Sequence, residues 1–154
     1  MTRWIGRIAA VLFLGGVAGH GALAAAPGPT GQWVVEDGKA AVDLEPCGDK
    51  LCGKIAWLKI PLNDQGKPKT DIHDGDSALQ TRPLCGLLML WDFTLNEDGF
   101  WSGGKIYDAE HGDVYSSTMH IQDDGRLRVR GYIGISLFGK SQIWTRPVAT
   151  LPHC

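Results

Sequence analysis

The residues best suited to chemistry in this chain are its four cysteines, Cys47, Cys52, Cys85 and Cys154. Cysteine thiolates can hold a metal, exchange electrons or form structural disulfides. A zinc site needs two closely spaced ligand pairs, and Cys47 and Cys52 supply only one. The chain also has no Cys-x-x-Cys pair of the kind used in redox enzymes. The choice therefore depends on the compartment, because disulfides persist in oxidising surroundings.

The beginning of the chain predicts export. Two arginines and no acidic residue precede a short apolar stretch, residues 8–17, and small residues follow it. This pattern is typical of a secretory signal peptide, and an A-x-A site favours cleavage after Ala24. Cleavage after Ala26 is the second choice, because a proline would then begin the mature chain. We expect residues 1–24 to be removed and residues 25–154 to form one periplasmic or secreted domain. The apolar stretch is shorter than the roughly 20 residues that cross a bilayer, so no membrane span is expected.

An even number of cysteines in an exported protein indicates disulfides, and four cysteines allow three connectivities. Cys47 and Cys52 flank residues 48–51, which we expect to form a four-residue turn between two strands. Such a turn brings its flanking residues to cross-strand distance, near the roughly 5.5 Å that a disulfide tolerates. We therefore predict a Cys47–Cys52 disulfide, and Cys85–Cys154 follows by elimination. Metal or redox chemistry is the weaker alternative.

Motifs for catalysis or metal binding are scarce. Residues 134–138, GISLF, lack the second glycine of a nucleophile elbow. The chain has no His-Glu-x-x-His and no phosphate-binding glycine loop. Residues 71–76, DIHDGD, are similar to a calcium loop, but the glycine stands fifth rather than sixth, so we expect a polar surface loop. The sequence therefore predicts no enzyme, no cofactor and no metal site.

One stretch, residues 101–117, concentrates aromatic and polar side chains. Its Gly103-Gly104 pair indicates a bulge or a close approach of the backbone. Aromatic rings with polar tips can orient a ligand at the mouth of a barrel. The candidate ligand-binding residues are Trp101, Lys105, Tyr107, Asp108 and Tyr115. The alternative is that these rings only pack the core, because aromatic residues are ordinary in strands.

Asp-Gly pairs that stand between two apolar runs predict hairpin turns, since they are typical of turns whose two central positions need positive φ. These pairs are Asp37-Gly38, Asp98-Gly99 and Asp124-Gly125. The flanking runs predict about eight strands, over residues 31–36, 39–44, 51–58, 87–95, 100–108, 114–122, 126–134 and 141–148. No stretch of the mature chain shows a helical period, and residues 61–83 predict a long loop. The fold class is therefore all-β, an antiparallel up-and-down barrel or a sandwich.

Charge argues against a nucleic-acid partner. The formal net charge is −2 at pH 7, whereas nucleic-acid binding needs clustered lysine and arginine. Arg126, Arg128 and Arg130 alternate along one predicted strand and therefore share a face. We interpret that face as solvated rather than as a site for a polyanion.

The first predicted strand opens with Gly31-Gln32-Trp33, which resembles the Gly-x-Trp motif of the lipocalin-like barrels, the calycins. In that family the tryptophan plugs the closed end of the barrel, and an arginine from the last strand stacks on it. Arg146, at the end of the last predicted strand, is the candidate partner of Trp33. A guanidinium over an indole contributes about 0.5–2 kcal/mol. The alternative is that Trp33 is an ordinary core residue.

A wider resemblance covers nearly the whole mature chain. Residues 31–59, 82–87, 101–119 and 127–146 are similar to the bacterial family called domain of unknown function 2147. The resemblance implies a small exported protein with a lipocalin-like β-barrel, and it implies no agreed activity and no catalytic residues. The family usually has Asp-Pro after Ile-Tyr, where this chain has Asp108-Ala109. Without the proline we expect a less rigid loop.

Two functions follow from a barrel of this size, because eight strands can either enclose a small ligand or be filled by their own side chains. The first is binding of a small apolar or amphipathic ligand between residues 87–93 and 101–107. The second is a structural or interaction role in the cell envelope, with a filled barrel. A continuous cavity of a few hundred Å³ would favour binding. Filling would be favoured if tryptophans point inward, namely Trp57, Trp91, Trp101 and Trp144.

Overall fold

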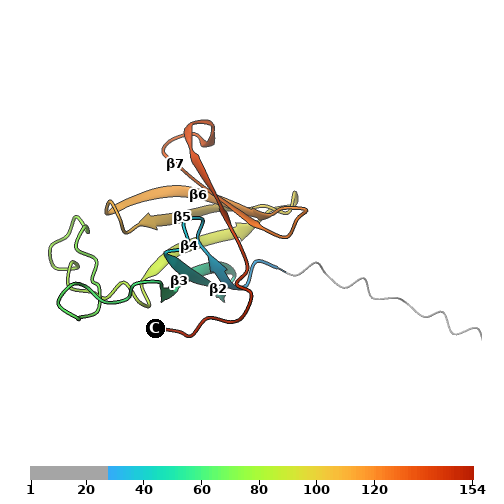
Figure 1. The fold of residues 1–154 in the computed structure, drawn as a ribbon. Helices are drawn as coiled ribbons and strands as arrows, with labels where there is room; N and C mark the ends of the chain where they lie inside the picture. The colour runs from blue at the N-terminus through green and yellow to red at the C-terminus, as the bar shows by residue number, and fades with distance from the viewer. Residues whose placement is uncertain (1–27) are drawn as a thin grey trace, which may run out of the picture.

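A computed structural model describes residues 28–154, so the predicted signal peptide and its cleavage site lie outside the described residues. Eight antiparallel strands follow one another in chain order, and each is hydrogen-bonded to the next (Figure 1). They are β1 (Gly31–Val34), β2 (Ala40–Cys47), β3 (Lys50–Leu58), β4 (Leu88–Leu95), β5 (Trp101–Asp108), β6 (Asp113–Ile121), β7 (Leu127–Tyr132) and β8 (Lys140–Trp144). A short 3₁₀ helix, η1 (Ser136–Phe138), lies between β7 and β8. The prediction of an all-β up-and-down fold is confirmed.

The sheet returns to its first strand just beyond β8. The Val34 amide donates to the carbonyl of Thr145 at 2.8 Å, and the Thr145 amide donates back to Val34 at 3.0 Å. This antiparallel bridge joins β1 to the end of the last strand. It closes the sheet into a barrel and favours the barrel over the sandwich.

The three Asp-Gly turns lie where they were predicted, but the prediction of two positive φ angles in each turn was wrong. Gly38, Gly99 and Gly125 have φ of 69°, 82° and 80°, whereas the preceding aspartates do not have positive φ. Each glycine amide donates to the carbonyl three residues earlier, so these loops are longer than two residues. In such loops only the last position needs the left-handed conformation that glycine adopts readily.

The barrel interior is filled by the protein's own side chains. One continuous cluster of buried residues comprises Trp33, Val42, Leu44, Leu51, Leu90, Phe93, Met119, Leu127, Val129 and Trp144. The predicted bulge is present, because the pairing of β5 with β6 shifts register between Trp101 and Gly104. The ring of Phe93 occupies the place where a Cβ on Gly104 would lie. Gly104 therefore makes room for a side chain of the neighbouring strand.

Both predicted disulfides are present, and such bonds fit an exported protein. The turn before Cys52 has only two residues between the strands, Gly48 and Asp49, rather than the four predicted. Cys47 lies opposite Lys50, so it reaches Cys52 diagonally, with 5.9 Å between the Cα atoms. The second bond, Cys85–Cys154, joins residues 69 positions apart, and its Cα atoms lie 6.0 Å apart.

Arg146 packs on Trp33, as the Gly-x-Trp motif predicted. The guanidinium carbon lies 3.8 Å from the centroid of the indole ring. The indole nitrogen of Trp33 donates to the carbonyl of Pro29 at 2.6 Å. Arg146 also donates to the carbonyls of Gln32 and Gly28, both at 3.3 Å. Burial lowers the pKa of Arg146, and these contacts hold the first and last strands together.

Candidate functional site

The structure does not bring the five predicted ligand-binding residues into one pocket. Trp101 lies opposite Met119 and packs against the interior cluster. Tyr115 lies opposite Ile106 and precedes Met119 by four residues on β6, which is about 13 Å along a strand. The two aromatic residues therefore lie near opposite ends of the same hairpin.

The other predicted residues make local contacts. Lys105 and Tyr107 flank Ile106, which packs on the interior cluster, so strand alternation places both on the opposite face. The Lys105 ammonium donates to the hydroxyl of Ser116 at 3.0 Å. Asp108 lies 2.8 Å from Nδ1 of His111, and this contact raises the pKa of His111. Asp108 thus fixes the β5–β6 turn, in which the family's proline is missing.

Tyr107 belongs to a buried polar network that sequence reasoning missed. Its hydroxyl donates to Asp71 at 2.8 Å, and the Arg82 guanidinium donates to the other oxygen of Asp71 at 2.7 and 3.0 Å. Arg82 also donates to Asp74 at 2.6 Å. Burial, followed by the contact with Asp71, raises the pKa of Tyr107 to about 12. The prediction of a polar surface loop was wrong for Asp71, which is fully buried, because its two partners satisfy the carboxylate.

This network anchors the long loop, residues 59–87, to the barrel. Tyr107 also packs with Ile55 and Leu87 in a second buried cluster. A Cβ on Gly112, in the β5–β6 turn, would collide with the backbone of His73. Figure 1 shows the loop beside that turn, at one end of the barrel. The network therefore has a structural task, which is to hold the loop against this end of the barrel.

The predicted inward tryptophans divide between these regions. Trp144 is buried in the interior cluster, and Trp101 packs against it. Trp91 instead packs against the cluster beneath the long loop. Trp57 is half-buried and belongs to neither cluster.

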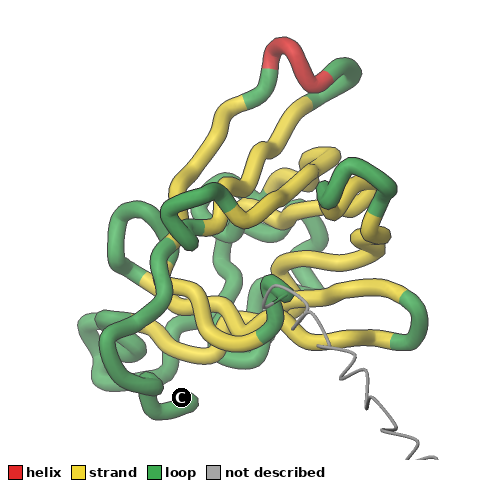
Figure 2. Tube along the Cα trace, turned by 90° about the vertical axis from the view of Figure 1, so that its right-hand side faces the viewer, coloured by secondary structure: helices red, strands yellow, loops and turns green. Residues whose placement is uncertain are grey.

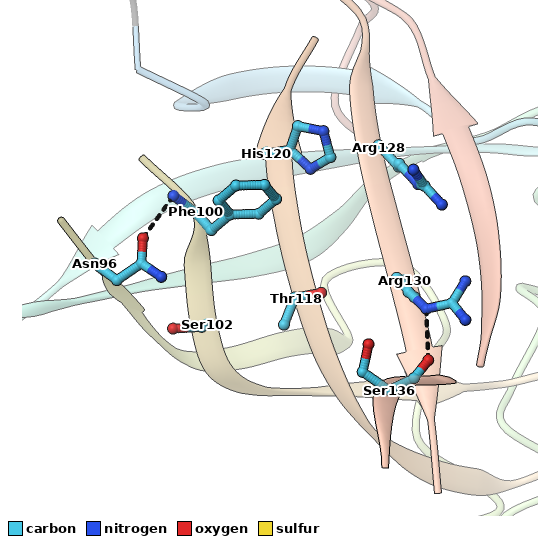
Figure 3. A pocket seen from close by; sticks show the side chains of 8 residues that line it. All are labelled: Asn96, Phe100, Ser102, Thr118, His120, Arg128, Arg130 and Ser136. Atoms are coloured by element: carbon cyan, nitrogen blue, oxygen red, sulfur yellow. Dashed lines mark hydrogen bonds between the residues drawn. The ribbon is translucent and has the colours of Figure 1, made fainter. Parts of the chain in front are cut away.

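A groove of about 440 Å³ lies on the outer face of the barrel (Figure 3). On β6 and β7 its residues alternate with buried Met119 and Val129, which places their side chains outside the barrel. The turn before β5 and the segment after β7 complete its walls. The lining residues are Asn96, Phe100, Ser102, Thr118, His120, Arg128, Arg130 and Ser136.

Two guanidinium groups give this groove a positive charge. Arg128 donates to the hydroxyl of Ser141 at 3.1 and 3.2 Å, and Arg130 donates to the same oxygen at 3.0 Å. Arg130 also donates to the carbonyls of Ser136 and Leu137 at 2.8 and 3.1 Å. Within residues 28–154 no carboxylate forms an ion pair with Arg128 or Arg130, whereas Arg126 pairs with Asp124 at 2.7 Å. Neutral acceptors thus hold the guanidiniums in place without cancelling their charge.

His120 adds a titratable group to the groove. Its ring lies 4.5 Å from the ring of Phe100, centroid to centroid. Burial first, and then the nearby charge of Arg128, lower the pKa of His120 below its usual range. His120 is therefore mainly neutral at pH 7 and can gain a proton when an anion offsets the charge of Arg128.

The chemistry of the groove is that of an anion site. Guanidiniums match carboxylates and phosphates in charge and geometry. The hydroxyls of Ser102, Thr118 and Ser136 can donate or accept, and Phe100 offers an apolar ring. The interpretation of Arg126, Arg128 and Arg130 as one solvated face was therefore incomplete, because two of the three line a concave surface.

A second surface pocket, of about 200 Å³, surrounds the Cys85–Cys154 disulfide. Its charged groups face each other, since Lys54 pairs with Glu45 at 3.0 Å and His153 lies 3.8 Å from Asp43. This pairing leaves the pocket with less unbalanced charge than the groove.

Residues 31–146 match the family model described as an uncharacterized protein conserved in bacteria, DUF2147. The chain belongs to the DUF2147 family. The match covers every strand of the barrel, from β1 to β8. The family description states no activity. No curated protein matches the chain.

A solved structure shares the fold of this DUF2147 protein. It is that of protein HP1028 from the human pathogen Helicobacter pylori, which is described as belonging to the lipocalin family. The two chains are 20% identical, the match covers 77% of this chain and 82% of the other, and the TM-score is 0.66. The similarity establishes a lipocalin-like barrel. Within residues 28–154 no helix is long and apolar enough to cross a membrane.

Proposed function

We propose that this DUF2147 protein is an exported binding protein of the cell envelope that holds a small anionic molecule in the groove outside β5, β6 and β7. The main support for this proposal is that Arg128 and Arg130 line a groove of about 440 Å³ and have no ion-pair partner among the described residues. The signal-peptide pattern and the two disulfides support export.

The filled interior supports a site on the outside. An apolar ligand between β4 and β5 would have to displace Leu90 and Phe93, which are fully buried in the interior cluster. Removing such side chains from a packed core costs several kcal/mol. The barrel is thus better suited to act as a rigid scaffold for its outer face, which agrees with the filled-barrel alternative.

The groove suggests the chemical class of the ligand. Arg128 and Arg130 are separated by one residue on β7, so their side chains leave the strand about 7 Å apart. A phosphate, sulfate or carboxylate could bridge them, while a ring or short chain rests on Phe100. The proposed role is anion binding, since the groove offers hydrogen-bond donors for an anion.

The proposal is tested by calorimetric titration of the mature protein with sulfate and with glycerol phosphate. Arg128→Gln should weaken saturable binding by about 10- to 100-fold, the range expected when a charge-assisted hydrogen bond is lost. Arg126→Gln is the matched control, because Arg126 lies directly before β7 and already pairs with Asp124. Absence of saturable binding, or equal weakening by both substitutions, would contradict a specific site in the groove.

A further inference from the structure

The segment between β7 and β8, residues 133–139, forms an apolar tip. Ile133, Ile135, Leu137 and Phe138 are 76%, 59%, 77% and 78% exposed. Figure 2 shows this tip, with η1 in red, projecting away from the body of the barrel. Single exposed apolar residues are ordinary, but four within six positions concentrate apolar surface in one loop, and concentrated apolar surface is typical of interaction sites.

The tip is held in a defined shape by Arg130. The guanidinium donates to the carbonyls of Ser136 and Leu137, and the Gly139 amide donates to the carbonyl of Ser136 at 3.1 Å. Part of the tip backbone is therefore satisfied within the protein while its apolar side chains face outward. This combination suits an apolar medium, where an unsatisfied backbone group is costly.

Charge distinguishes the base of the tip from the rest of the chain. Residues 126–146 contain five basic residues and no acidic residue, although the whole chain has a formal net charge of −2. Arg128, Arg130 and Lys140 flank the tip, and none forms an ion pair with a carboxylate of the described chain. An apolar surface bordered by unpaired cations is complementary to a membrane that carries anionic lipid.

We propose that the tip is an interfacial anchor that inserts Ile133, Ile135, Leu137 and Phe138 into the boundary between headgroups and acyl chains of an anionic phospholipid membrane. Groups bound in this way enter by about 5–10 Å. Lys140, opposite Gly131 at the base of the tip, then lies nearest the phosphates, and its aliphatic stem covers apolar surface. The anchor does not require the groove to bind a free anion, so the two proposals can fail separately.

The test is co-sedimentation of the mature protein with vesicles of phosphatidylcholine, alone or with about a third of phosphatidylglycerol. The wild type should bind the anionic vesicles and bind the neutral ones more weakly. The double substitution Leu137→Ser with Phe138→Ser should weaken binding to the anionic vesicles by at least about tenfold. A matched control is Ile60→Ser with Ile72→Ser, since these side chains are 63% and 62% exposed on the long loop. The control should bind like the wild type.

Lys140→Gln separates the electrostatic contribution. It should weaken binding to anionic vesicles about fivefold and leave binding to neutral vesicles unchanged, whereas Lys67→Gln on the long loop should change neither.

Two results would overturn the proposal. One is equal binding by the tip variant and the wild type, or no binding by either. The other is a wild-type dimer in light scattering that becomes a monomer in the tip variant, because a second copy would then cover the tip. Sulfate titration of the tip variant reports on the groove alone.

Discussion

The long loop, residues 59–87, and the tip, residues 133–139, both connect neighbouring strands, but they differ in which side chains they bury and which they expose. The long loop buries a charged residue, Asp71, and satisfies it with Arg82 and Tyr107. The tip exposes four apolar residues and uses Arg130 to satisfy its backbone. The loop therefore uses its polar contacts for its own docking, whereas the tip leaves its apolar surface available. We infer that the loop serves stability and that the tip serves an interaction.

The largest expected effect concerns the disulfide that ties the long loop to the C-terminus. Replacing Cys85 and Cys154 together by serine should lower the free energy of unfolding by about 4 kcal/mol, because the bond closes a separation of 69 residues. Replacing Cys47 and Cys52 should cost only about 2 kcal/mol, because their separation is 5. Urea denaturation without reductant measures both values. Equal losses would show that loop length does not govern the effect.

Next in size is the buried network of the long loop. Arg82→Met should destabilise the protein by about 2–3 kcal/mol, since it leaves a buried carboxylate without its cation and Arg82 is itself partly exposed. Thermal unfolding should shift by roughly 10 °C. The double variant Arg82→Met with Asp71→Asn should recover part of the loss, because the uncompensated charge is gone. If Arg82→Met melts like the wild type, the network does not anchor the loop.

A smaller effect concerns pH and the groove beside the tip. Sulfate does not titrate in this range, and its charge favours protonated His120, whose pKa lies below the usual value in the free protein. Sulfate affinity should therefore be flat between pH 7 and 8 and rise a few-fold as pH falls below 6. His120→Gln should abolish the rise. His111→Gln should preserve it, since His111 contacts Asp108 outside the groove. A rise that follows His111 instead would place the site elsewhere.

The smallest expected effect is that of the tip on folding. Leu137→Ser should change the free energy of unfolding by less than about 0.5 kcal/mol, because the side chain is 77% exposed. Chemical denaturation beside Arg82→Met makes the comparison direct. A loss of unfolding free energy above about 1 kcal/mol would mean that the tip packs on the barrel and contributes to stability as the long loop does.

Features carried by local sequence could be predicted. The Asp-Gly turns, the cysteine pairs and the Gly-x-Trp motif each depend on a few adjacent residues or on a simple count. Closure of the barrel and the stacking of Arg146 on Trp33 were implied by the resemblance of the Gly-x-Trp motif to lipocalin-like barrels. The family resemblance extended these local signals to the whole chain.

Features carried by distant partners could not be predicted. The sequence around Asp71 is typical of a surface loop. Asp71 is buried because Tyr107, 36 positions away, donates a hydrogen bond to it. The groove forms because strand register places Ser102, Thr118 and Arg130 on one face, and sequence alone does not fix that register. The tip was missed for another reason, since residues 126–134 were predicted as one strand, while β7 ends at Tyr132 and leaves the following apolar residues outside the sheet.

We infer that this protein binds through its outer face while its interior serves as a scaffold. The most direct test is an NMR titration with sulfate that follows the side-chain NH signals of Arg128 and Arg130 together with the indole NH signals of Trp33 and Trp144. We expect saturable shifts of the arginine signals and unchanged indole signals, because Trp33 and Trp144 are buried in the filled interior. Shifts of the two indole signals, with the arginine signals unchanged, would place the ligand inside the barrel and contradict binding at the outer face.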